Sequence, residues 1–178
     1  MEKTIVILRG INVGGNRKIL MNDLKSMFHD LGIPDAITYI QSGNVIFESS
    51  LDPIELSNLI ESAILEKFGF VVPVIIRKAK ELEKSIKSNP FYDSEADVNN
   101  LHLTFLKQKP LKSDLDLIQS IDYTPDLFVV KEMNVFIYCE GKYHESKLTN
   151  NFFEKTLKVG ATTRNWKTVL KLIELSKD

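Results

Sequence analysis

Short apolar runs and helical patterns alternate along this chain in an order that occurs twice, and this repetition limits the fold more than any other feature. The first half opens with the apolar run Ile5–Leu8, and a helical pattern, a hairpin, a second helix and another apolar run follow. Apolar runs this short, bounded by glycine or proline, indicate buried strands. The order is therefore β-α-β-β-α-β, which predicts an α+β fold.

Turn and capping residues mark the elements of the first half. Ser42-Gly43-Asn44 separates two strands, at 37–40 and 45–47, and predicts a hairpin. Asp52 and Pro53 suit the N-cap and first position of a helix. The run Val71–Ile76 predicts the closing strand of this half.

The plan restarts after a polar stretch at residues 91–100. A linking helix over 79–86 precedes this stretch, and a strand at 101–106, a helix at 111–118 and a hairpin at 127–138 follow it. Two short helices, one around 152–157 and one from Arg164 to about Leu175, end the chain. No closing strand is obvious in this half, so a strand borrowed from the first half is one solution. The sequence predicts subdomains at 1–77 and 101–178, joined by a linker at 78–100.

Composition excludes several classes of protein. With 178 residues, 43% hydrophobic and 26% charged, the chain can bury a substantial core without disulfides. A net charge of −1 provides no general attraction for nucleic acids or anionic membranes. The only cysteine, Cys139, lies in an apolar run and is interpreted as a buried structural thiol. The apolar run near the N-terminus is too short for a signal peptide or a membrane span, so we expect a cytoplasmic protein that contacts no membrane.

The loop after the first strand is the strongest candidate for a binding site. It contains Arg9, Gly10, Asn12, Gly14 and Gly15 and precedes a helix. Glycines, cations and a helix N-terminus together suit an anion such as phosphate. The residues after Gly15 do not fit a P-loop, and the dinucleotide-binding pattern is absent. A connecting loop with solvated basic side chains explains the same residues.

Topology predicts that a second segment lies near this loop. In a βαββαβ sheet the first and third strands are antiparallel neighbours, so the end of the first strand lies beside the start of the third. Ser42 and Asn44 would then share one edge of the sheet with Arg9 and Asn12.

A third segment lies near the C-terminus. Thr162 or Thr163 suits a helix N-cap, and Arg164 would then lie in the first turn, where a cation opposes the helix dipole. Arg164 could pair with a carboxylate or hold an anion, and Lys147 could join it. Trp166 fits a buried helical stripe.

Other kinds of site find no support in the sequence. The strand positions that carry base-stacking aromatics in RNA-recognition motifs hold Val6, Asn44, Ile46 and Ser49, so RNA binding of that type is not expected. The three histidines have no metal-ligand spacing, and no nucleophile motif occurs. We therefore predict no cofactor and no metal, and the sequence assigns no catalytic residue.

Four segments together resemble a widespread bacterial family, domain of unknown function 1697. They are Leu8–Gly15, Ile40–Val45, Lys147–Asn150 and Ala161–Trp166. The resemblance runs nearly end to end and implies two ferredoxin-like subdomains with exchanged terminal strands, without an established activity. The motif positions that it carries over are Arg9, Gly10, Asn12, Gly14, Gly15, Ser42, Gly43, Asn44, Lys147, Thr163, Arg164, Asn165 and Trp166.

The resulting hypotheses differ in the partner that they predict. The first is a protein that binds a small anion, phosphate or nucleotide through the glycine-rich loop. The second is a non-catalytic interaction module that uses an exposed sheet edge, and the third is weak, sequence-independent binding of nucleic acid. The oligomeric state is not readable from the sequence.

Overall fold

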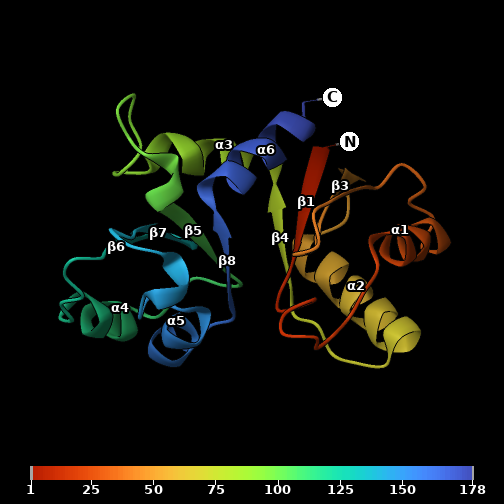
Figure 1. Ribbon diagram of the computed structural model, residues 1–178. Helices are drawn as coiled ribbons and strands as arrows, with labels where there is room; N and C mark the ends of the chain where they lie inside the picture. Colours follow the sequence, from red (N-terminus) through yellow and green to blue (C-terminus); the bar gives the residue numbers. More distant parts are fainter. Residues whose placement is uncertain (1, 178) are drawn as a thin grey trace. The chain divides into compact units, whose positions relative to one another are not determined.

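The computed structural model describes residues 2–177 and confirms the duplicated α+β plan. The first half consists of β1 (Glu2–Leu8), α1 (Met21–Asp30), β2 (Ile37–Tyr39), β3 (Asn44–Ser49), α2 (Pro53–Phe68) and β4 (Val74–Lys78). Its antiparallel sheet has the order β2-β3-β1-β4, and α1 and α2 cover one face of the sheet (Figure 1).

The second half repeats this arrangement after α3 (Ala79–Ser88). Its elements are the short helix η1 (Val98–Asn100), β5 (Leu101–Leu106), α4 (Lys112–Gln119), β6 (Leu127–Lys131), β7 (Asn134–Tyr138), the short helix η2 (Tyr143–Glu145), α5 (Asn150–Leu157), β8 (Ala161–Asn165) and α6 (Trp166–Leu175). The sheet order, β6-β7-β5-β8, is the counterpart of the first. The chain therefore contains two ferredoxin-like sheets of the same topology.

Strand register provides independent support for the duplication. Ile5 of β1 pairs with Arg77 of β4, and Leu103 of β5 pairs with Arg164 of β8. Both arginines are buried, and burial lowers the pKa of each guanidinium to about 10, with the charge of Glu81 partly opposing this at Arg77. A buried arginine therefore occupies the same register position in both halves.

The closing strand of the second half is a correction to the sequence prediction. Residues 161–165 form β8 and not the start of a helix, and α6 begins at Trp166. Asn165, not Thr162 or Thr163, caps α6, because its Oδ1 accepts the backbone N–H of Thr168 at 2.8 Å. Threonine suits both caps and strands, and pairing with β5 decides between them. Arg164 therefore does not lie in a helical first turn.

Two further expectations are corrected. Within residues 2–177, each sheet takes all four strands from its own half, so no terminal strand is exchanged. The closing strand of the first half is β4, which begins at Val74 and not at Val71. Pro73 has no N–H to donate to a ladder, and Val71 is exposed.

Contact density divides the chain into two compact units. Unit 1 comprises Met1–Glu83 with Leu172–Asp178, and unit 2 comprises Lys84–Lys171. The division passes through α3 and α6.

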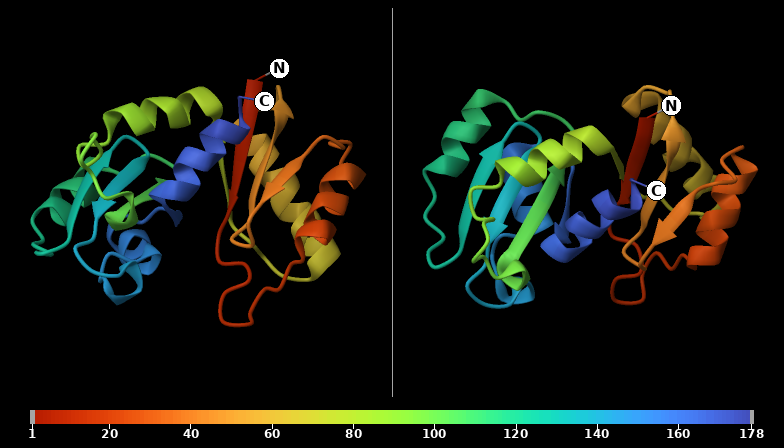
Figure 2. Two further views of the ribbon diagram at one scale, coloured as in Figure 1. Left: turned by 45° about the horizontal axis from the view of Figure 1, so that its top comes forward. Right: turned by 90° about the horizontal axis from the view of Figure 1, so that it is seen from above.

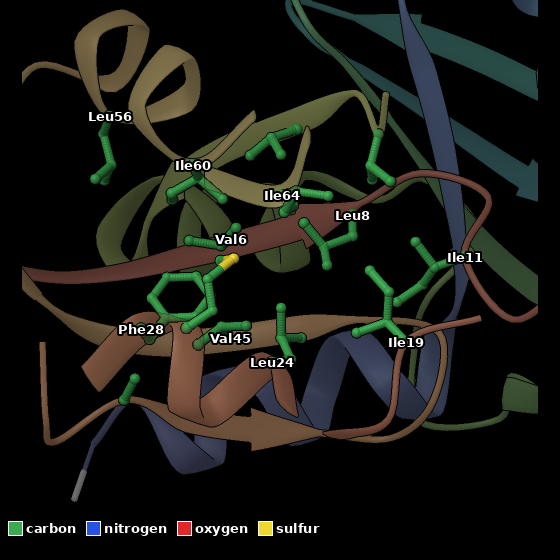
Figure 3. Packing of buried hydrophobic residues seen from close by; sticks show 14 of the residues in the cluster. Val6, Leu8, Ile11, Ile19, Leu24, Phe28, Val45, Leu56, Ile60 and Ile64 are labelled. Atoms are coloured by element: carbon green, nitrogen blue, oxygen red, sulfur yellow. The ribbon is translucent and has the colours of Figure 1, made fainter. Parts of the chain in front are cut away.

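The core of unit 1 lies between its sheet and the helices α1 and α2. Val6 and Leu8 point into a cluster with Leu24 and Phe28 of α1 and Ile64 of α2 (Figure 3). Every residue from Ile5 to Leu8 is buried, which explains why this run is continuously apolar and does not alternate. The core fixes the end of β1, where the glycine-rich loop begins.

Within residues 2–177, no helix is both long and apolar enough to cross a membrane.

Candidate functional site

The glycine-rich loop between β1 and α1 folds into a small hairpin. Asn12 donates its backbone N–H to the carbonyl oxygen of Arg17 at 3.2 Å, and Asn16 donates to that of Val13 at 3.0 Å. Gly14 and Gly15 form the tip, with φ of 57° and 79°. Two successive positive φ values are typical of a type I′ turn, which favours glycine. Figure 2 shows the loop extending beyond the end of the sheet of unit 1.

Both ends of the loop are fixed to the unit. Ile11 and Ile19 are buried in the core cluster (Figure 3). The side chain of Asn12 closes the loop between them: its Oδ1 accepts the N–H of Ile19 at 2.9 Å, and its Nδ2 donates to the carbonyl oxygen of Ile19 at 2.9 Å. The same Nδ2 donates to the carbonyl oxygen of Gln41 at 2.8 Å. Asn12 therefore joins the loop to the β2–β3 turn, and both of its amide protons are used.

The predicted proximity of the two segments is confirmed. Ile7 pairs with Asn44 across β1 and β3, and the N–H of Leu8 donates to the carbonyl oxygen of Gly43 at 2.9 Å. Asn44 is fully buried, and its Nδ2 donates to the carbonyl oxygen of Tyr39 at 3.0 Å and to Ser42 Oγ at 3.2 Å. Ser42 and Asn44 therefore shape the turn from inside.

Gly43 permits the close approach of the turn to β1. Its φ is +80°, and a Cβ atom there would lie 2.6 Å from Ile11 Cδ1 and 2.9 Å from Leu8 Cβ. Any side chain at this position would displace the strand or the loop. The motif residues Asn12, Ser42, Gly43 and Asn44 thus act together as a scaffold.

A pocket lies at the base of the hairpin, at the N-terminus of α1. Its volume is about 310 Å³, and its lining residues are Asn12, Lys18, Ile19, Leu20, Met21, Asn22 and Gln41. Leu20, the N-cap of α1, has no side-chain oxygen to accept the first-turn amides, and no side chain of the described residues caps this helix. The first intrahelical bond runs from the N–H of Leu24 to Leu20, so the N–H groups of residues 21–23 have no partner within the helix.

The predicted residues of unit 1 fall into distinct positions around this pocket. Asn12 lines it, whereas Gly14 and Gly15 lie at the hairpin tip. Arg9 is half-buried and donates its backbone N–H to the carbonyl oxygen of Pro73 at 3.0 Å, outside the lining. Arg17 lies over Gly10, its Nη1 being 3.4 Å from where a Cβ of Gly10 would be. Lys18 is the cation that lines the pocket.

The sequence places Lys18 at the end of the candidate loop as one of three nearby cations, but it does not assign Asn22 and Gln41 to the site. The sequence signal for a site here was Leu20 at the N-cap position of α1. A helix whose N-cap is not Ser, Thr, Asp or Asn leaves its first-turn amides for another acceptor.

The predicted residues of unit 2 form a separate set. Lys147 is exposed, while Arg164 is buried and donates from Nη1 to Thr162 Oγ1 at 3.2 Å and to the carbonyl oxygen of Thr163 at 3.0 Å. A buried guanidinium that bonds its own strand has a structural role in β8. The structure does not bring Lys147 and Arg164 into a described contact.

Thr163, which is half-buried, is the centre of a network of polar side chains. Its hydroxyl donates to Asn150 Oδ1 at 2.6 Å and lies 2.7 Å from that of Thr104, so Thr104 donates to Thr163. Tyr143 also hydrogen-bonds Thr163, and its ring stacks on His102 with centroids 4.4 Å apart. Burial raises the pKa of Tyr143 and lowers that of His102.

The pair in unit 1 that corresponds to Thr104 and Thr163 is apolar. Val6 pairs with Ile76 where Thr104 pairs with Thr163. The two halves therefore share a fold but differ at this strand pair, where unit 2 carries threonine side chains and unit 1 carries apolar ones.

Among residues 2–177, no group of three or more histidine, cysteine, aspartate or glutamate side chains could hold a metal ion. Cys139 is a free, buried thiol, and burial raises its pKa, which disfavours the reactive thiolate.

The chain is similar in fold to a solved structure, the conserved bacterial protein SP0830 from Streptococcus pneumoniae. The similarity covers 98% of each chain with a TM-score of 0.79 and 22% sequence identity. No curated protein matches the chain. A family model described as "Protein of unknown function (DUF1697)" matches residues 1–136, and the chain belongs to this family.

Proposed function

We propose that the protein binds a small anion, with the phosphate group of a small molecule or nucleotide as the leading candidate, in the pocket at the N-terminus of α1. The observation that carries the proposal is the combination of an uncapped helix of ten residues with Lys18 in a pocket of about 310 Å³. Free first-turn amides and the helix dipole favour an anion at this position.

The amide side chains of the pocket support this ligand class. Asn22 and Gln41 supply further donors, and the hairpin locked by Asn12 holds them in place before any ligand binds. Asp23, in the first turn of α1, is a negative charge near the pocket. Its carboxylate repels an anion there, so its removal tests whether an anion binds.

The experiment is a titration with inorganic phosphate, followed by the backbone amide chemical shifts of residues 21–23. We expect Lys18→Met to weaken binding about fivefold, since one charge at 4 Å in water contributes about 1 kcal/mol. Asp23→Asn should strengthen binding by a similar factor. Lys25→Met, which removes an exposed cation farther along α1, is the matched control.

Leu20→Ser tests the helix terminus directly. Serine would accept the first-turn amides, so it should stabilise the protein by about 0.5–2 kcal/mol and weaken phosphate binding. Wild-type affinity in Leu20→Ser and Lys18→Met would contradict the proposal.

We also propose a cytoplasmic location, where the free thiol of Cys139 stays reduced.

A further inference from the structure

Strand β6 of unit 2 lies at an edge of its sheet with one side unpaired. It is the outermost strand in the order β6-β7-β5-β8 (Figure 1). Its sequence, Leu-Phe-Val-Val-Lys, is apolar except for the last residue, and Leu127 is 47% exposed.

The hydrogen bonds of the neighbouring strands identify the groups at this open edge. Met133 and Cys139, at the two ends of β7, form backbone hydrogen bonds on the side of β5. The carbonyl oxygen of Met133 accepts the N–H of Leu106 at 3.0 Å, and the N–H of Cys139 donates to the carbonyl oxygen of Asn100 at 2.8 Å. Along an antiparallel strand, successive residues direct their backbone N–H and C=O groups to opposite neighbours. The even-numbered residues of β7 therefore hydrogen-bond to β6, where their partners are Leu127, Val129 and Lys131. It follows that Phe128 and Val130 direct their N–H and C=O groups away from the sheet.

The equivalent edge of unit 1 is protected, but β6 is not. The counterpart β2 has only three residues, whereas β6 has five. Short edge strands, charges, prolines and bulges prevent unwanted strand pairing. Residues Leu127–Val130 contain no charge and no proline.

A groove of about 260 Å³ runs beside this edge. One wall is β6, from Leu127 to Val130, and the other is formed by residues between Gln119 and Asp126. Asp122 and Asp126 are the charged residues of the lining, and none of the lining residues is a cation. Hydrogen bonds from Thr124 lower the pKa of Asp122, so this carboxylate is ionised at neutral pH.

We infer that β6 binds an extended peptide segment that carries lysine or arginine, by adding it to the sheet as a further strand. The outward N–H and C=O groups of Phe128 and Val130 bond the backbone of the peptide. Basic side chains on the groove side meet Asp122 and Asp126. This surface belongs to unit 2, so the inference is independent of the pocket proposed in unit 1.

Charge disfavours a second copy of β6 as the occupant. Two copies of β6 could pair as antiparallel strands about a two-fold axis at Val129, so that Phe128 of each copy lies opposite Val130 of the other. In that register Asp126 of each copy lies opposite Glu132 of the other, which gives two pairs of like charges. Like charges opposite one another destabilise a strand pair. A basic peptide instead meets the carboxylates of Asp122 and Asp126 in the groove, and Lys131 at the end of β6 is the one cation of the strand.

The test uses the whole protein and a seven-residue peptide that alternates valine and lysine, with amide hydrogen exchange measured by NMR. Bound peptide should slow exchange at Phe128 and Val130 at least tenfold and leave Val129, which already bonds to β7, unchanged. A peptide with glutamate in place of lysine should bind at least fivefold more weakly. A peptide whose N–H groups facing β6 are methylated at alternate residues should no longer slow exchange at Phe128 and Val130.

Variants of the protein separate strand addition from surface adhesion. Val130→Pro removes an outward N–H without removing a β6–β7 bond and should abolish binding. Val130→Thr keeps the N–H and should bind like the wild type. Asp122→Asn keeps an oxygen acceptor for Thr124 and should weaken the lysine peptide about fivefold.

Two results would overturn the inference. The first is saturation with the lysine peptide without protection of Phe128 and Val130, or equal binding of the glutamate peptide. The second is a dimer whose free form already protects both amides, which would identify a second copy as the occupant. Loss of phosphate binding in Lys18→Met has no bearing on either result.

Discussion

Thr163 shows how one hydroxyl can be the hydrogen-bond partner of several buried and half-buried groups. Thr163→Val keeps the shape of the side chain but leaves Thr104, Tyr143 and Asn150 without this partner. Unsatisfied buried polar groups cost about 1–3 kcal/mol, so we expect a loss of that size in the free energy of unfolding, measured with urea. Thr163→Ser retains the hydroxyl and should lose less. Equal losses in both variants would show that packing, not hydrogen bonding, governs this position.

His102 should make stability depend on pH. Burial lowers its pKa from the ordinary 6.5, with a smaller opposing effect from the backbone of Asn100. The unfolded chain therefore binds a proton at higher pH than the folded protein does. The stabilisation that neutral His102 contributes is fully present above about pH 7, and the free energy of unfolding falls as the pH drops below about 6.5.

Urea unfolding at several pH values checks this dependence. The His102→Gln variant should lose the part of the slope that sets in as the pH drops below about 7. His144→Gln removes a histidine whose side chain is 75% exposed, and it should keep the slope. An unchanged slope in His102→Gln would assign the dependence to other groups.

At the scale of elements, the turn between β2 and β3 determines the geometry of the loop beside it. Gly43→Ala forces a side chain into a positive φ, at about 1–2 kcal/mol, and sets its Cβ against Leu8 Cβ, which cannot move away as a flexible side-chain end can. Overpacking adds about 1–3 kcal/mol. Gly14→Ala should lose only the free energy needed to hold alanine at a positive φ, since nothing lies within 4 Å of the Cβ position. Urea denaturation of the two variants should separate these contributions, and similar losses would contradict the steric argument.

The sequence predicts most elements because their signals are local. Asp52 caps α2 as expected, accepting the N–H groups of Ile54 and Glu55, and the hairpin at Ser42–Asn44 forms as its turn residues predict. The strand β8 was missed because threonines suit two structures and only pairing with a distant strand selects one. The antiparallel pairing of β1 and β3 allowed the proximity of Asn12 to the β2–β3 turn to be predicted.

The role of Asn12 could not be predicted in the same way. Its φ of 56° and its bonds to Ile19 and Gln41 depend on the folded loop. The pocket likewise depends on how the closed hairpin and α1 lie against each other in the folded unit, and no local residue pattern specifies that arrangement.

At the scale of the whole molecule, the two units share continuous helices. The boundary between Glu83 and Lys84 lies inside α3, and that between Lys171 and Leu172 lies inside α6. Unfolding of one unit interrupts both helices, so we expect a single cooperative transition.

Two probes can test this expectation in one urea titration. Trp166 fluorescence reports on unit 2, and exchange of the β1 amides reports on unit 1. Their midpoints should coincide. Two separate midpoints would show that the units unfold independently.

The open tip of the loop hairpin has a practical consequence. Bonds between Asn12 and Arg17 and between Val13 and Asn16 close the hairpin below Gly14 and Gly15, and a Cβ atom at either glycine would meet nothing within 4 Å. Exposed loop tips of this kind tolerate insertions. An epitope or an environment-sensitive dye grafted between the two glycines would project into solvent a short distance from the pocket, and would turn the protein into its own reporter for ligand screening.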